Sequence, residues 1–223
     1  MKFIEYPDRE LLFAGVVDAV VSELNSALMT GERASMAVPG GATPVPVYEV
    51  LSDIALDWAR IDLVLTDERW LPESDPRSNT RLLREHLLKN KAAAANLVPL
   101  HRDTPTPEES LGALEGGVRA LVPLDVVLLG MGEDMHTASL FPDGDKLDLA
   151  LSAKAPALVA MRAPSVPEPR VTLTVPVLSS AFSKHLLITG EAKRLALERA
   201  QGMLPELAPI AALMSGLKVH WAP

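Results

Sequence analysis

Cysteine is absent from this 223-residue chain. Its absence excludes disulfide bridges, catalysis by a thiolate, and zinc or iron–sulfur sites that use cysteine ligands. Basic residues are in the minority as well: 21 Lys and Arg stand against 29 Asp and Glu, a net charge of −8, and they form no dense block. Because nucleic acids are held by clustered Lys and Arg, we expect no nucleic-acid partner.

Long apolar runs are missing too. No uninterrupted run approaches the roughly 20 residues of a membrane-spanning helix. Charged residues and Pro7 interrupt the N-terminus before the apolar segment of a signal peptide could develop. We therefore expect a cytoplasmic protein without a membrane partner. The hydrophobic fraction of 48% is typical of a globular chain, and the length suits one domain over residues 1–223, as a monomer or a weak homo-oligomer.

Short apolar runs alternate with segments of helical periodicity along the whole chain. Strands are predicted at residues 34–38, 61–66, 98–100, 126–129, 158–161, 170–174, 186–189 and 217–221. Helices are predicted at residues 8–29, 45–56, 79–89, from 104 onward, 175–182 and 190–201. This alternation predicts an α/β fold with a mostly parallel sheet that is covered by helices on both faces.

The apolar run of residues 126–129 ends at Gly130 and Gly132 in a polar loop that carries Asp134 and His136. This pattern predicts a buried strand with a loop at its C-terminal end, where parallel sheets bind their ligands. Histidine gains and loses a proton near neutral pH without special tuning. The pair is therefore a candidate acid–base site; the alternative is a loop histidine that only hydrogen-bonds the backbone.

A second loop joins the strand at 34–38 to the helix at 45–56. Gly40 and Gly41 allow the backbone to approach a ligand closely, and Ala42 and Thr43 complete the turn. Thr43 suits the N-cap of the helix and the proline that follows suits its first position. Because a helix N-terminus gathers free N–H groups and partial positive charge, this loop is a candidate phosphate cradle. The alternative is an ordinary capped turn.

Charged side chains lie at the ends of three further predicted elements. Asp67 and Arg69 follow the strand at 61–66, Arg170 begins the strand at 170–174, and Lys193 lies near the start of the helix at 190–201. The helix dipole disfavours a cation at that end, so Lys193 indicates a role toward an anion. As alternatives, Asp67 and Arg69 form a surface ion pair, and the other two cations are solvated.

Nucleotide and metal sites are not indicated. Neither the Walker-A pattern nor the full Gly-x-Gly-x-x-Gly fingerprint is present. The remaining histidines, at 86, 101, 185 and 220, lie singly on predicted helix or strand edges, without the paired spacing of a metal site. We expect neither a metal nor a cofactor.

Several of these segments resemble motifs of the 6-phosphogluconolactonase family, in that family's order and over most of the chain. The long central segment is the specific one. The matching segments are Pro39–Pro44, Thr66–Trp70 with Ser78–Asn79, Gly130–Pro142, Pro169–Leu173 and Thr189–Lys193. The resemblance implies a three-layer α/β/α fold with a Rossmann-like sheet of the sugar-phosphate isomerase type. It also implies a cofactor-free hydrolase of 6-phospho-D-glucono-1,5-lactone, the second enzyme of the oxidative pentose phosphate pathway.

The resemblance further implies a role for each candidate residue. His136 is expected to act as the general base for the attacking water, with Asp134 orienting the loop or the imidazole. Asp67 is expected to bind sugar hydroxyls or to order Arg69, and Arg69 to contact either the phosphate or the carbonyl oxygen. The expected phosphate clamp consists of Arg170, Lys193 and the amides of Gly41–Thr43.

Two departures from the family pattern are visible. The family usually has glycine between the aspartate and the histidine, where this chain has Met135, so the backbone there must accept a Cβ atom. A histidine often found near the Ser-Asn pair is replaced by Asp75. Ser139 lacks the Gly-x-Ser-x-Gly context of a nucleophile and is interpreted as structural.

Two other functions stay open as alternatives. A glucosamine-6-phosphate deaminase or isomerase shares the fold and the phosphate site, but its histidine loop continues into Asn-Glu-Pro. This chain has Phe141 in place of that carboxylate, and phenylalanine cannot transfer a proton. A sugar-phosphate-sensing domain of a transcription regulator would keep Arg170 and Lys193, yet no helix-turn-helix segment with a basic face precedes Phe3.

Overall fold

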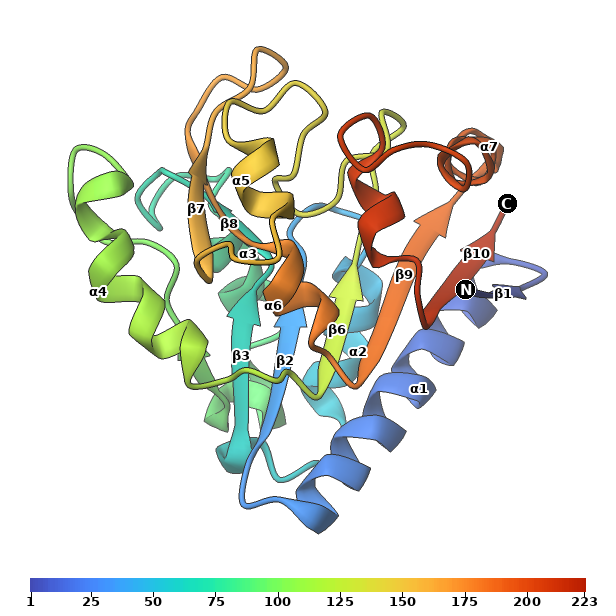
Figure 1. Ribbon diagram of the computed structural model, residues 1–223. Helices are drawn as coiled ribbons and strands as arrows, with labels where there is room; N and C mark the ends of the chain where they lie inside the picture. Colours follow the sequence, from blue (N-terminus) through green and yellow to red (C-terminus); the bar gives the residue numbers. More distant parts are fainter.

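A seven-stranded sheet forms the centre of the protein in the computed structural model, which describes all residues, 1–223 (Figure 1). The strand order is β1-β10-β9-β6-β2-β3-β5, and every neighbouring pair is parallel. The strands are β1 (Lys2–Glu5), β2 (Ala34–Val38), β3 (Ile61–Leu65), β5 (Asn96–Val98), β6 (Val126–Leu129), β9 (Ser183–Thr189) and β10 (Leu217–Ala222).

Helices cover both faces of this sheet. On one face α1 packs beside α2, while α5, α6 and a second, smaller sheet lie over the other face (Figure 1). The helices are α1 (Arg9–Thr30), α2 (Val45–Asp53), α3 (Asn79–His86), α4 (Glu108–Arg119), α5 (Leu147–Leu151), α6 (Val175–Ser179) and α7 (Glu191–Ala200). One hydrophobic core of 58 buried residues joins these layers. The predicted three-layer arrangement around a mostly parallel sheet is confirmed.

The second sheet has three antiparallel strands in the order β4-β8-β7. They are β4 (Asp67–Arg69), β7 (Leu158–Met161) and β8 (Arg170–Leu173). The sequence predicted strands at 158–161 and 170–174 but did not predict that they form a separate antiparallel sheet, which has a topological reason. A parallel crossover needs a dozen or more residues, and the short proline-rich link between these strands allows only a hairpin.

Several predicted boundaries shift in the structure. The helices α2, α3 and α6 end three residues before the predicted ends, and β5 lies two residues earlier than expected. The position of β5 is set by its pairing with β3, where the Asn96 side chain donates to Asp62 at 2.6 Å. Strand β1 was not predicted, because its residues are mostly exposed and show no apolar run.

Helix α1 is long and apolar enough by composition to cross a membrane. Asp18 and Glu23 interrupt its sequence, however, and its side chains Leu12, Val16 and Val20 are fully buried in the core. Core helices of globular proteins pass the same test of length and hydropathy, and the packing of α1 against the sheet places it in that class.

The prediction that the remaining histidines lie singly is wrong for two of them. His185 on β9 and His220 on β10 hydrogen-bond each other at 2.9 Å inside the core. The other ring nitrogen of His185 contacts Glu23 of α1 at 2.6 Å, and His220 bonds the hydroxyl of Tyr6 at 2.9 Å. Their positions in the sequence are 35 residues apart, so only the register of β9 with β10 brings them together.

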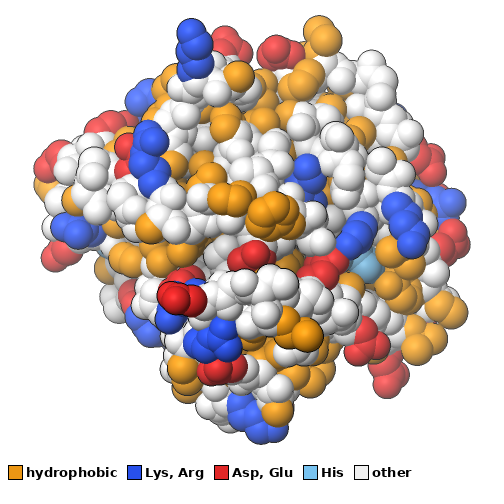
Figure 2. Space-filling view, turned by 60° about the horizontal axis from the view of Figure 1, so that its bottom comes forward, with side chains coloured by type: hydrophobic (Ala, Val, Ile, Leu, Met, Phe, Trp, Pro, Cys, Tyr) orange, Lys and Arg blue, Asp and Glu red, His pale blue; other side chains and the backbone are white.

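The outer surface agrees with the dispersed charges of the sequence. On the face shown in Figure 2, Lys and Arg side chains are scattered among acidic and apolar ones and form no continuous basic patch.

Candidate active site

A cavity of about 420 Å³ opens at the carboxyl ends of the central strands β2, β3, β6 and β9. Its volume and its position outside the strand ends are typical of a small-molecule site. Of the predicted site residues, all but one line this cavity: Gly40, Gly41, Ala42, Thr43, Asp67, Arg69, His136, Arg170 and Lys193. The exception, Asp134, does not line the cavity but contacts His136, which does.

Asp134 contacts the imidazole of His136 directly. The carboxylate oxygen Oδ1 lies 2.6 Å from Nδ1 and also accepts the backbone N–H of His136 at 3.2 Å. The hydrogen bond from His136 lowers the pKa of Asp134. With this carboxylate ionised, Nδ1 must carry a proton, so the Nε2 lone pair of the neutral ring is free to accept another.

The backbone of the histidine loop is shaped to bring these two side chains together. A Cβ atom on Gly132 would lie 2.3 Å from the Asp134 carboxylate and 2.4 Å from the His136 ring, so only glycine fits. Met135 has φ of +67°. This left-handed conformation is energetically unfavourable for any residue that has a Cβ atom. The loop thus keeps the backbone shape that glycine would adopt freely, although methionine stands there.

The loop Gly40–Thr43 offers unused donors to the cavity. Gly41 has φ of +89°, and the amides of Gly41, Ala42 and Thr43 donate no hydrogen bond within the protein. The carbonyl of Pro39 accepts the buried hydroxyl of Tyr48, which fixes the start of the loop. Three free N–H groups on one short loop are suited to an anion.

The expected cap of α2 by Thr43 is wrong. The helix begins at Val45 with Pro44 at the N-cap position and without a side-chain cap. Pro44 and Pro46 also lack N–H groups, so the first turn of α2 supplies fewer donors than a usual helix N-terminus. The anion-binding capacity therefore resides mainly in the loop amides.

Three cations border the cavity, and each has unused hydrogen-bonding capacity. Arg170 is only 8% exposed, and burial lowers its pKa. Its Nε atom and that of Arg69 are buried without a hydrogen-bond partner. Lys193 lies in the first turn of α7, and its ammonium group has no ion pair within the protein. Buried guanidinium donors without partners are costly, so these groups are suited to an anionic ligand.

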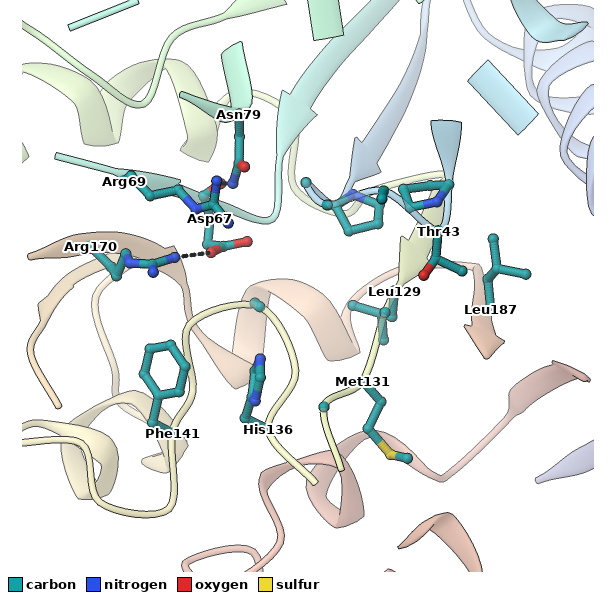
Figure 3. Close-up of a pocket in the computed structure, with 18 of the residues that line it drawn as sticks. Thr43, Asp67, Arg69, Asn79, Leu129, Met131, His136, Phe141, Arg170 and Leu187 are labelled. Carbon is teal, nitrogen blue, oxygen red and sulfur yellow. Dashed lines mark hydrogen bonds and ion pairs between the residues drawn. The ribbon is translucent and has the colours of Figure 1, made fainter. Parts of the chain in front are cut away.

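Asp67 connects the histidine loop to the cation side of the cavity. Its Oδ2 atom accepts the Ser139 hydroxyl at 2.6 Å and lies 3.9 Å from Arg170 (Figure 3). The structure shows no hydrogen bond or ion pair from Asp67 to Arg69, so the expectation that it orders Arg69 has no contact to support it. Ser139 is fully buried and holds Asp67, which agrees with a structural role.

Phe141 and Asn79 are two of the lining residues that were not among the predicted site residues. Phe141 lies beside His136, with ring centroids 4.9 Å apart, and the guanidinium carbon of Arg170 lies 5.9 Å from the Phe141 ring centroid (Figure 3). Asn79, the first residue of α3, is 1% exposed and borders the cavity next to Asp67. Both belong to the motif segments of the sequence, and that membership was the signal that could have identified them. Neither is charged, and outside the loop Gly40–Thr43 the sequence analysis selected charged or titratable side chains from those segments.

The family model for glucosamine-6-phosphate isomerases/6-phosphogluconolactonase matches residues 7–221. The chain belongs to this family. Two family members show how close the relation is. The chain is 41% identical over 213 residues to the 6-phosphogluconolactonase of Pseudomonas aeruginosa, covering 94% of this chain and 90% of that protein. It is 39% identical over 219 residues to the 6-phosphogluconolactonase of Rhizobium meliloti, covering 95% of this chain and 94% of that protein.

A solved structure of the glucosamine-6-phosphate isomerase/6-phosphogluconolactonase family supports the same relation. A 6-phosphogluconolactonase from Shewanella baltica is similar with a TM-score of 0.93 at 30% identity, covering 100% of this chain and 98% of that one. The resemblance inferred from the sequence motifs is thereby confirmed, as is the prediction of an enzyme of the 6-phosphogluconolactonase type, a lactone hydrolase.

Proposed function

We propose that this protein hydrolyses 6-phospho-D-glucono-1,5-lactone to 6-phospho-D-gluconate in the oxidative pentose phosphate pathway. The observation that supports this most is the placement of the Asp134–His136 pair in a cavity that also carries cations with unpartnered N–H donors and free backbone amides. An activated ester at one end of the substrate needs a base, and the phosphate dianion at the other end needs positive donors.

In this mechanism His136 acts as the general base through Nε2. Asp134 holds Nδ1–H and stabilises the imidazolium that forms. The Nε2 atom takes a proton from a water molecule, whose oxygen attacks the lactone carbonyl carbon and forms a tetrahedral intermediate. When this intermediate collapses, the bond between the carbonyl carbon and the ring oxygen breaks, and the ring oxygen receives the proton from His136.

The opposite side of the cavity holds the phosphate. Arg170 offers a planar guanidinium, Lys193 a point charge, and the loop Gly41–Thr43 its free amides. Arg69 is placed to contact either the phosphate or the carbonyl oxygen, on which negative charge develops during the reaction. Asp67 accepts the Ser139 hydroxyl through Oδ2 and the Thr66 hydroxyl through Oδ1, and the remaining lone pairs of this cavity-lining carboxylate are placed to accept sugar hydroxyls.

The two alternative functions receive less support. Phe141 fills the space beside His136, where the deaminase mechanism requires a carboxylate, and a phenyl ring cannot transfer a proton. A purely sensing domain would need the cation side alone, whereas this protein retains the carboxylate–imidazole pair. Ammonia release from glucosamine-6-phosphate is the assay that would favour the deaminase.

Residues 1–223 are proposed to act as one domain, supported by the single hydrophobic core. A cytoplasmic location, the lack of a nucleic-acid partner and a monomeric or weakly associating state are part of the same proposal. The docking of α1 against the sheet supports the location, and the scattered charges on the face shown in Figure 2 support the lack of a nucleic-acid partner.

The decisive experiment follows hydrolysis of the lactone, generated in situ, with the wild-type protein and with His136→Ala. After subtraction of the spontaneous rate, we expect a large acceleration by the wild type and a loss of about 100- to 10,000-fold in kcat for the variant. A wild type that binds 6-phosphogluconate but gives no acceleration would contradict the proposal and favour the sensing domain.

A further inference from the structure

Asn79 fills the gap between two segments of the cavity wall. Its Nδ2 atom donates to the backbone carbonyl of Asp67 at 2.9 Å. Its Oδ1 atom, which has no hydrogen-bond partner, packs on Gly40, where an added Cβ atom would lie only 2.0 Å away. One side chain therefore touches both the phosphate loop and the segment that carries Asp67 and Arg69.

Asn79 is itself held by the carboxylate of Glu68, which is fully buried. The two oxygens of Glu68 accept the amides of Arg69 at 2.7 Å, Asn79 at 2.8 Å and Thr80 at 2.7 Å. They also accept the hydroxyls of Ser78 at 3.2 Å and Thr80 at 2.7 Å. Five donors from two chain segments thus converge on one carboxylate at the N-terminus of α3, where the helix dipole favours negative charge.

The placement of Glu68 favours more than a structural role. Burying a carboxylate is costly unless every oxygen is hydrogen-bonded, and apolar residues could close the same gap. Glu68 stands in β4 between Asp67 and Arg69, both of which line the cavity, and it binds the amide of Arg69 directly. Any shift of this carboxylate would move Arg69 and, through Asn79, the phosphate loop.

We propose that Glu68 and Asn79 form a positioning unit that fixes the distance between the phosphate loop at Gly40 and the Asp67–Arg69 segment. Glu68 does not line the cavity, and Asn79 borders it with its side chain packed on Gly40. Both act by holding the phosphate-binding and lactone-binding parts of the cavity in register. The inference rests on the proposed function, because it assumes one substrate that spans both parts. A misplacement of about 1 Å in such a site is enough to cost roughly 100-fold in rate.

The test compares Asn79→Ala and Glu68→Gln with a matched control. Asp62→Asn also alters a nearly buried carboxylate on a neighbouring strand, but its partners Arg33 and Asn96 lie outside the cavity. For the two test variants we expect kcat/KM for the lactone to fall about 10- to 100-fold and the calorimetric affinity for 6-phosphogluconate to fall several-fold. For the control we expect both quantities within about 2-fold of the wild type at a lowered melting temperature.

A double-mutant cycle tests the inference even where Glu68→Gln fails to fold. Gly40→Ala alone forces a Cβ atom into Asn79, and the added Asn79→Ala change removes the atoms that clash. We expect the double variant to be more active than Gly40→Ala, measured per folded molecule. Strict additivity, or test variants no weaker than Asp62→Asn, would overturn the inference.

A failure of the proposed function can be distinguished from a failure of the positioning unit. A wild-type protein without lactonase activity contradicts the proposed function, while loss of 6-phosphogluconate affinity in Asn79→Ala, but not in Asp62→Asn, would still support the positioning unit.

Discussion

His136 and Asp134 are two residues apart, and this spacing alone brings the carboxylate to the imidazole once Gly132 allows the loop to close. The sequence therefore identified this proposed acid–base pair from local information. It did not identify the tilted contact of the His136 ring with Phe141, whose ring centroid lies 4.9 Å away.

We predict that Asp134→Asn lowers kcat by about 100-fold or more, because an amide neither fixes the Nδ1–H tautomer nor stabilises the imidazolium. The affinity for 6-phosphogluconate is expected to change less than about 3-fold, since Asp134 does not line the cavity. Steady-state kinetics with calorimetry measures both quantities. An unchanged kcat would remove Asp134 from the mechanism.

The left-handed backbone at Met135 predicts that a glycine variant at this position is more stable than an alanine variant. Met135→Ala and Met135→Gly remove the same side-chain packing, apart from one methyl group, so their difference isolates the cost of a Cβ atom at positive φ. We expect the glycine variant to exceed the alanine variant by about 1 kcal/mol in free energy of unfolding. Denaturant titration measures it, and an alanine variant of equal or greater stability would contradict the argument.

At the scale of elements, the antiparallel sheet β4-β8-β7 has the largest effect on the site. Arg69 of β4 lies directly opposite Arg170 of β8 in this sheet, and Asp67 opposite Thr172. Two cations 101 positions apart in the chain thereby reach the same wall of the cavity. No local pattern in the sequence encodes this pairing, because it depends on the hairpin that β7 and β8 form.

Three elements also meet at the buried histidines, where α1 contributes Glu23, β9 His185 and β10 His220. Burial, with a further contribution from His185, lowers the pKa of His220 to about 4. Burial alone would raise the pKa of Glu23, but hydrogen bonds from His185 and Lys218 lower it to about 2.

Both shifts predict a loss of stability in acid. The stabilising contribution of neutral His220 is complete above about pH 6.5 and declines as pH falls toward 4, and that of Glu23 declines from about pH 4.5 toward 2. The His220 part is on the order of 3 kcal/mol. We expect His220→Gln to flatten the fall in unfolding free energy between pH 6.5 and 4.

The control for this experiment is His101→Gln, which alters a half-buried ring that makes a tilted contact with Trp70. Denaturant titrations at several pH values should show that the unfolding free energy of this variant falls between pH 6.5 and 4 as steeply as that of the wild type. If the unfolding free energy of His220→Gln falls with pH as steeply as that of the wild type, the acid sensitivity does not come from the buried histidines.

At the scale of the whole molecule, ligand binding should stabilise the fold, because the cavity draws on residues from both sheets and from loops throughout the chain. At a 6-phosphogluconate concentration of 100 times Kd, the gain is about 2.7 kcal/mol. That corresponds to roughly 5–10 °C in melting temperature for a chain of this size.

We expect Arg170→Ala to weaken 6-phosphogluconate binding roughly 10- to 100-fold, through loss of charge-assisted hydrogen bonds. At the same ligand concentration its thermal shift should fall to a few degrees. Arg119→Ala is the control, since this exposed residue of α4 pairs only with Glu115. Equal shifts for the wild type and Arg170→Ala would exclude Arg170 from the phosphate clamp.

The sequence by itself determined the parallel sheet and the identity of the chemical groups at its edge. Apolar periodicity is a local property, and the turn glycines and charged residues that follow β2, β3, β6 and β9 are read directly from the chain. Because parallel strands end at the same edge, those groups had to converge there. The family motifs added the substrate class.

Only the tertiary structure decided which of these groups touch. Asp67 pairs with Arg170 rather than Arg69, Asn79 packs on Gly40, and His185 meets His220. Each contact joins residues far apart in the chain, and each depends on strand order, register and the switch to an antiparallel second sheet. Such long-range pairing is set by the packing of the whole core, so local sequence patterns do not contain it.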